Sequence, residues 1–207
     1  MYILSSVCGD SLDTTSFLPA LDIKGREEGL FTQCLTYGSV LGRRHLDTAF
    51  INAVKNFAYG ENFARTFTLE ILLMLSGQRQ IKDALDHFGL STGSKRFLIF
   101  LSPRAGVEGL IRDYSMENII TYRKNFELRY KESLIAGGRR LIRGLGLNEE
   151  WIISGTGPQK SPEIVSDEPL RDELLAMSGI QISEKIKTDP IDIEKMVCEK
   201  INLIQCK

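Results

Sequence analysis

The chain has 207 residues, 26 Lys and Arg side chains against 27 Asp and Glu, and a formal net charge of -1. With 43% hydrophobic and 26% charged residues, its composition is that of an ordinary soluble globular protein. The N-terminus lacks the basic stretch of a signal peptide, and the polar-free run at residues 71–75 is far shorter than the roughly 20 residues a membrane helix needs. We therefore expect a cytoplasmic protein.

The charge is distributed unevenly along the chain. Residues 43–145 carry 17 basic and 10 acidic side chains, whereas the two flanks together carry 9 basic and 17 acidic ones. A segregated field of this kind can hold a polyanion on one face. Interleaved charge on a solvated surface explains the same numbers equally well. The near-neutral total alone therefore does not exclude a nucleic-acid ligand.

Strands and helices are predicted in turn along the first part of the chain. Residues 1–8 are small and apolar and end at a Gly-Asp turn, which predicts a strand, and residues 31–37 lie between two glycines and predict a second strand. The next helix has apolar residues at i, i+3, i+4 and i+7 spacing and ends at Gly60. These apolar residues are Leu46, Ala49, Phe50, Ala53 and Phe57.

Two further helices follow. Asn62 is the predicted N-cap of the first, which ends in residues 69–75 and is apolar nearly all round, so we expect it to be buried against other elements or against a partner. Gly77 interrupts it. The second helix spans residues 81–88 and ends at Gly89.

The chain then predicts a central strand at residues 96–101, after which the periodicity weakens. Ser115 is the predicted cap of a segment that extends through Tyr122, and glycines within residues 134–145 argue against one continuous helix. Residues 154–168 predict a loop. Two helices are predicted near the end of the chain, over residues 170–177 and 190–204. Together the elements predict a single α/β (α+β) domain, in which helices surround a small mixed or antiparallel sheet.

Most of the candidate metal-binding, phosphate-binding and catalytic residues lack the partner residues that such sites require. The four cysteines form no C-x-x-C pair and lie far from both histidines, so we expect no metal site. The Gly155-Thr156-Gly157 loop lacks the rest of a phosphate-binding motif. For Glu70 and His45, structural roles are favoured over catalytic ones.

The string Gly9-Asp10-Ser11-Leu12 follows a predicted strand, as the nucleophile block of GDSL-type esterases does. An activated serine needs a histidine within hydrogen-bonding reach, and no histidine follows His87. A hydrolase that uses Ser11 therefore remains a remote alternative, and we expect no enzymatic activity.

The junction between the two apolar helices, residues 76–82, is the remaining candidate site. It places the backbone N–H groups of a helix start beside Arg79, Gln80 and Lys82, where a phosphate or a nucleotide edge could lie. Arginine offers bidentate donors and a planar face, and glutamine reads donor and acceptor patterns.

Residues 40–101 resemble a known family, the CGI/TPRKB-type small subunit of the KEOPS complex, which makes threonylcarbamoyl-adenosine in transfer RNA. The resemblance is carried by Gly42, His45-Leu46, Ala49, Ala53, Glu70-Ile71-Leu72, Leu75-Ser76-Gly77-Gln78-Arg79-Gln80-Ile81, Ala84-Leu85 and Phe88-Gly89. The helix at 190–204 fits the family as well, whereas residues 146–189 resemble an insertion or flexible loop.

The resemblance implies a non-catalytic subunit without a cofactor. Such a subunit binds the Bud-type atypical kinase and other KEOPS subunits, stimulates ATP turnover there, and captures the single-stranded CCA end of tRNA. The expected RNA contacts are Arg79 and Gln80, flanked by Arg43, Arg44, His45, Lys82, Lys95 and Arg96. The expected partner interface comprises Leu72, Leu73, Met74 and Leu75 or, on the C-terminal helix, Ile193 and Val197. A pure interaction scaffold that regulates the kinase without binding RNA remains an alternative.

Overall fold

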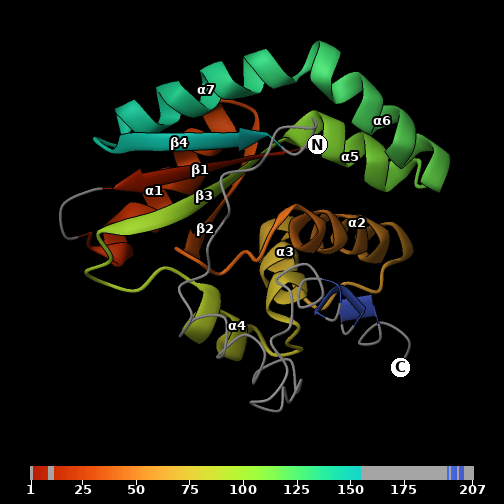
Figure 1. The fold of residues 1–207 in the computed structure, drawn as a ribbon, viewed down its shortest axis with the longest axis horizontal. Coiled ribbons are helices and arrows are strands. Elements are labelled where there is room, and N and C mark those ends of the chain that lie inside the picture. Colours follow the sequence, from red (N-terminus) through yellow and green to blue (C-terminus); the bar gives the residue numbers. More distant parts are fainter. Residues whose placement is uncertain (1, 9–11, 155–194, 196, 200, 203–207) are drawn as a thin grey trace.

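The computed structural model describes residues 2–8, 12–154, 195, 197–199 and 201–202 (Figure 1). In these residues, four antiparallel strands form one sheet in the order β2-β3-β1-β4. The strands are β1 (Ile3–Cys8), β2 (Leu30–Thr36), β3 (Arg96–Pro103) and β4 (Asn148–Ser154). The helices are α1 (Thr14–Glu27), α2 (Arg43–Tyr59), α3 (Phe67–Ser76), α4 (Ile81–Phe88), α5 (Arg104–Arg112), α6 (Met116–Arg129) and α7 (Lys131–Gly144). The predicted fold class, a small antiparallel sheet among helices, is confirmed.

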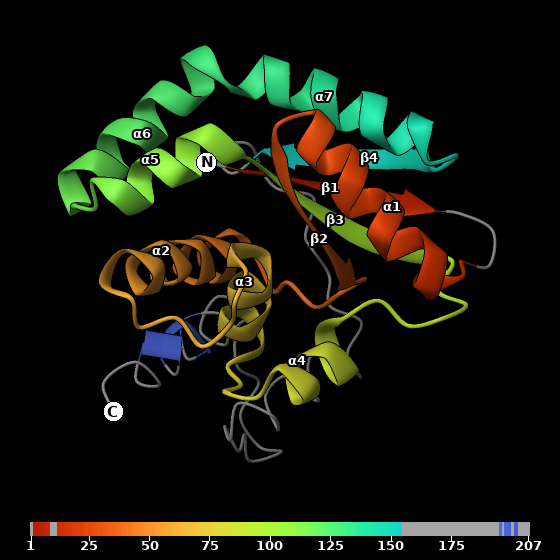
Figure 2. The same ribbon diagram turned by 180° about the vertical axis from the view of Figure 1, so that it is seen from behind.

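Both faces of the sheet are covered, so the middle strand alternates between two cores. Phe97, Ile99 and Leu101 of β3 pack in the core formed with α1 and α7, whereas Leu98 and Phe100 pack on the other side against α2 and α3. Figures 1 and 2 show α1 and α7 on one side of the sheet and the α2–α3 pair on the other. Successive side chains of a strand point to opposite faces, which produces this alternation.

The α2–α3 pair follows the predicted pattern with one correction. Gly60 and Gly77 have the left-handed conformation, with φ of 69° and 64°, and they end α2 and α3 as expected. The N-cap of α3, however, is Thr66, whose hydroxyl accepts from the N–H of Leu69. Asn62 instead bonds the carbonyl oxygen of Ala64 within the preceding loop, so its predicted role as the cap is wrong.

Five elements of the structure have no counterpart in the prediction or differ from it. Helix α1 is not predicted because only Phe17, Leu21 and Gly25 are buried along it, a stripe too narrow to give a clear period. Helix α5 is also missing from the prediction, and α7 runs as one helix through its two glycines. Residues 148–154, assigned to an insertion, form the edge strand β4. Ser115 does cap α6, accepting from the N–H of Asn118, but α6 continues beyond Tyr122 to Arg129.

At the C-terminal end, the described residues Lys195, 197–199 and 201–202 are helical, in agreement with the helix predicted there. Val197 and Ile201 are buried in the core that contains α2 and α3, and the Nδ2 of Asn52 donates to the Oδ1 of Asn202 at 3.0 Å. The helix predicted at 170–177 and the loop predicted at 154–168 lie outside the described residues, apart from Ser154 at the end of β4.

Candidate nucleic-acid interface

The turn between α3 and α4 presents the first predicted site. Ser76 organises it: its Oγ donates to the carbonyl oxygen of Leu73 at 3.0 Å and accepts from the N–H of Gln78 at 3.2 Å. Beyond Gly77 the chain turns outward, and Arg79, Gln80 and Lys82 are exposed, with Gln80 as the N-cap residue of α4. The turn therefore holds two cations and an amide on the surface, beside the start of a helix.

A buried histidine connects this turn to the start of α2. The Nε2 of His45 lies 2.9 Å from the carbonyl oxygen of Leu75, and its Nδ1 accepts from the N–H of Leu41 at 3.2 Å. Burial lowers the pKa of His45 to about 4, because the charged imidazolium is poorly solvated there. The prediction that His45 contacts RNA is wrong, since the ring is buried and its nitrogens face backbone groups.

The two arginines that precede this histidine differ in their availability. Arg44 is exposed at the first turn of α2. Arg43 is half-buried, and its Nε lies 3.6 Å from the carboxylate of Asp47. Asp47 in turn accepts from the hydroxyl of Tyr2 at 2.6 Å and from Arg123 at 3.0 Å. Arg44 is thus better placed than Arg43 to meet a ligand.

A third basic segment lies at the start of β3, where Lys95 and Arg96 are exposed. The guanidinium of Arg96 lies 4.0 Å above the ring of Tyr37, which follows β2. The hydroxyl of Thr36 donates to the carbonyl oxygen of Gly89 at 2.6 Å, so the end of β2 is attached to the end of α4. Tyr37 is a planar group that the prediction missed, although an aromatic residue in a loop next to a basic region is a signal the sequence offers.

Three segments that are distant in sequence are therefore held together at one end of the sheet: the β2–α2 loop, the α3–α4 turn and the α4–β3 loop. The contacts of His45, Thr36 and Tyr37 connect them. Exposed cations together with a planar ring are the groups that hold a short single-stranded nucleic acid by phosphate contacts and stacking.

The predicted partner interface on α3 requires a correction. Leu72, Leu73, Met74 and Leu75 are 0–2% exposed and pack in the core with α2 and the sheet, so their side chains do not form a surface. Val197 is likewise buried, and Ile193 lies outside the described residues. The apolar sequence of α3 reflects the fact that other elements surround it on all sides.

Exposed apolar side chains gather instead where the end of α2 meets the α5–α6 turn. Tyr59 and Met116 are 61% and 55% exposed, and Ile120, one helical turn beyond Met116, is 50% exposed. The rings of Tyr59 and Tyr114 are 5.4 Å apart, and the hydroxyl of Tyr114 lies 4.0 Å from the sulfur of Met116. We call Tyr59, Tyr114, Met116 and Ile120 the α2–α6 patch.

Among the described residues, no group of three or more His, Cys, Asp or Glu side chains could hold a metal ion. No described helix is both long enough and apolar enough to cross a membrane. Glu70 is buried and accepts three hydrogen bonds, in agreement with a structural role, and Ser11 lies outside the described residues.

Comparison with known proteins gives two similarities. Residues 31–124 match the model of the family described as kinase binding protein CGI-121. Over 52 residues the chain is 44% identical to the KEOPS complex subunit Cgi121 of Pyrococcus abyssi (strain GE5 / Orsay), a stretch that covers 25% of this chain and 30% of that protein. The predicted resemblance to this family is thereby confirmed for the middle of the chain.

Proposed function

We propose that this chain is a non-catalytic, cytoplasmic subunit of a KEOPS-type complex, which docks on a Bud-type kinase and brings the CCA end of tRNA to it for threonylcarbamoyl-adenosine modification. The observation that carries the proposal is the match of residues 31–124 to kinase binding proteins, together with the similarity to a KEOPS subunit. The matched residues include α2, α3 and α4, and therefore the α3–α4 turn with its exposed cations.

The RNA contact is assigned to the exposed residues of the three converging segments. Arg79 and Gln80 are the first choices, and the flanking side chains are Arg44, Lys82, Lys95, Arg96 and, to a lesser degree, Arg43. Arg96 above Tyr37 offers a planar surface for an unstacked base. A net charge of -1 favours a short RNA contact. Binding a single-stranded tail requires few phosphate contacts, whereas coating a duplex requires many.

The kinase contact is assigned to the α2–α6 patch, because the side chains predicted on α3 are buried. Tyrosine and methionine are enriched in protein interfaces, and exposed apolar groups that lie together mark such surfaces. Asp113 and Glu117 are exposed next to this patch, so the matching kinase surface is expected to be apolar with a basic rim. The C-terminal helix remains the second candidate, through its exposed residues.

Co-purification with a Bud-type kinase tests this assignment. Met116→Asp together with Tyr59→Asp is expected to abolish capture of the kinase, because it places charge in an apolar contact. Leu128→Asp is the matched control: it adds charge at the other end of α6, where Leu128 is 85% exposed, and should leave capture unchanged. If both variants retain the kinase, the contact lies elsewhere, and if the unaltered chain fails to bind it, the proposed function is wrong.

Two alternatives make different predictions. A pure scaffold would bind the kinase but would not shift tRNA even at low salt. A hydrolase that uses Ser11 would turn over esters, and Ser11→Ala would abolish that turnover.

A further inference from the structure

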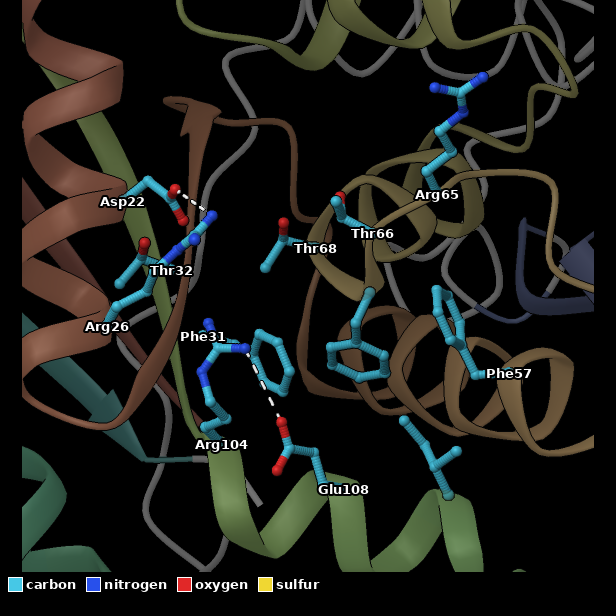
Figure 3. Close-up of a pocket in the computed structure, with 12 residues that line it drawn as sticks. Asp22, Arg26, Phe31, Thr32, Phe57, Arg65, Thr66, Thr68, Arg104 and Glu108 are labelled. Carbon is cyan, nitrogen blue, oxygen red and sulfur yellow. Dashed lines mark ion pairs between the residues drawn. The ribbon is translucent and has the colours of Figure 1, made fainter.

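An open pocket of about 330 Å³ lies beside the edge strand β2, between α1, α3 and α5 (Figure 3). It is lined at the start of α3 by Phe67 and Thr68, whereas Arg79 follows the other end of that helix. At 1.5 Å per residue the two ends of α3 are roughly 14 Å apart, so this pocket is separate from the proposed RNA site. Its volume is at the lower end of the range found for small-molecule sites.

Two arginines of the lining are already held in position. The guanidinium of Arg104 lies 4.1 Å above the ring of Phe31, and it forms an ion pair with Glu108 at 3.8 Å. Arg26, on α1, is paired with Asp22 at 2.7 Å (Figure 3). A guanidinium has five N–H donors, and one such contact leaves several of them for an anion. Ring stacking and ion pairing also reduce the entropy that each arginine loses when it binds a ligand.

Two threonines of the lining come from different sides of the pocket: Figure 3 shows Thr32 beside Arg26 and Thr68 at the start of α3. Thr32 and Thr68 both line the pocket and are half-buried, and neither hydroxyl has a hydrogen-bond partner among the described residues. The methyl group of Thr32 packs against α1, where a Cβ at Gly25 would come within 2.6 Å of it. The hydroxyl of Thr32 lies 3.0 Å from the same Cβ position, so both branches of this side chain face Gly25, and Thr68 is the hydroxyl available to a ligand in the pocket.

The remaining wall is apolar. Phe67 contacts both Phe31 and Phe57, with ring centroids 5.2 and 6.0 Å apart, and Ile111 completes this side. Counting all lining residues, three arginines face two carboxylates, and the two carboxylates are those paired with Arg26 and Arg104. The net charge of +1 comes from Arg65, which points away from the cavity in Figure 3, so anion binding depends on the N–H donors that Arg26 and Arg104 have left. The apolar wall favours a ligand with a planar or apolar body.

We propose that this pocket binds a small nucleotide-type ligand, in which a phosphate group lies between Arg26 and Arg104 and a planar base lies against the phenylalanine wall. The hydroxyl of Thr68 donates to a phosphate oxygen. Arginine and hydroxyl donors around an oxyanion are the arrangement that phosphate groups prefer. A mononucleotide combines the charge and the planar body that the two walls require.

Titration of the full chain with AMP, adenosine and inorganic phosphate, followed by calorimetry and by NMR shifts, tests the proposal. AMP is expected to bind at least tenfold more tightly than adenosine or phosphate alone, and to shift resonances of Phe31, Thr32 and Thr68. Arg104→Ala and Thr68→Val should each weaken AMP binding, Arg104→Ala by tenfold or more. Arg112→Ala, which alters an exposed arginine on the same helix but outside the pocket, should leave it unchanged.

Each other result overturns the proposal. Absence of AMP binding at millimolar concentration excludes the site. Equal affinity for AMP and adenosine removes the role of the arginines, and equal affinity for AMP and phosphate removes the role of the phenylalanine wall. Unchanged AMP affinity in both Arg104→Ala and Thr68→Val, with circular dichroism that shows both variants folded, places the ligand elsewhere.

Discussion

The imidazole Nε2 of His45 lies 2.9 Å from the backbone carbonyl oxygen of Leu75, and this contact joins the first turn of α2 to the last turn of α3. It connects two segments that are 30 residues apart in the chain. Because Gly77 and Arg79 follow directly, the same contact holds the α3–α4 turn beside Arg44. A buried neutral histidine thus positions the proposed RNA-binding residues without contacting RNA itself.

The His45 contact predicts that the protein becomes less stable in acid. The folded-state pKa of about 4 lies below the ordinary value of 6.5, so the unfolded chain binds the proton more readily. The contribution of His45 to the free energy of unfolding is therefore fully present above pH 6.5. It decreases by about 3 kcal/mol as the pH drops towards 4. Urea unfolding at pH 7, 5 and 4 measures this decrease.

The matched variants separate this histidine from other acid-sensitive groups. His45→Gln should be less stable at pH 7 but should show a smaller further decrease in stability on acidification. His87→Gln, which alters the exposed histidine of α4, should retain the pH dependence of the unaltered chain. Parallel curves for His45→Gln and the unaltered chain would contradict the assignment.

Glu70 is predicted to be essential for the loop between α2 and α3. Its carboxylate accepts from Asn56 at 2.7 Å and from the N–H groups of Phe63 and Ala64 at 3.0 and 2.8 Å. Glu70→Ala should lower the free energy of unfolding by about 3 kcal/mol, because two buried donors and one part-buried donor are left without their acceptor. Glu61→Ala, at an exposed position of the same loop, should change it by less than about 0.5 kcal/mol. Equal effects in chemical denaturation would refute this role.

Asp47 is predicted to couple Tyr2, the residue before β1, to α2 and α6. It accepts from the hydroxyl of Tyr2 at 2.6 Å and from Arg123 at 3.0 Å, and burial together with the Asp47 charge raises the pKa of Tyr2. A double-mutant cycle with Asp47→Asn and Arg123→Met should give a coupling free energy of about 0.5–2 kcal/mol. Strict additivity of the two substitutions would show that the ion pair does not attach α6 to α2.

The α3–α4 turn is predicted to supply part of the RNA affinity. Arg79→Ala together with Lys82→Ala should weaken tRNA binding about tenfold or more and should reduce the dependence of log K on log salt by about 0.7 for each phosphate that is no longer neutralised. Arg129→Ala together with Arg143→Ala removes the same charge from α6 and α7 and serves as the control. Filter binding across a salt series compares them. A similar weakening in the two double variants would indicate a general charge effect and no local site.

Local signals predicted most of the elements, and tertiary contacts account for the errors. The glycines at 60, 77 and 89 and the apolar spacing located α2, the end of α3, and α4 correctly. Strand β4 was missed because an edge strand is defined by its pairing with β1, which no local pattern in residues 148–154 reveals. The N-cap of α3 was misplaced because Asn62 and Thr66 are both good caps, and the Glu70 contacts to the loop select the later one.

The sequence predicted which residues lie near the candidate site better than it predicted which of them are exposed. Arg79, Gln80 and Lys82 are exposed as expected, whereas His45 is buried. Its position four residues before Ala49 places it on the apolar face of α2, and that spacing is a signal the sequence contains. The contact of Arg96 with Tyr37 depends on the pairing of β2 with β3 and was not accessible from local sequence.

Binding of tRNA to the purified full chain, with and without the terminal CCA, across a salt series tests the proposed function most directly. We predict that the chain binds tRNA at low salt and that log K falls only gently with log salt, because few phosphates are contacted. Removal of the CCA end should abolish this binding. Equal affinity for tRNA with and without its CCA end, or no binding at low salt, would contradict the proposal that this chain recruits tRNA by its tail.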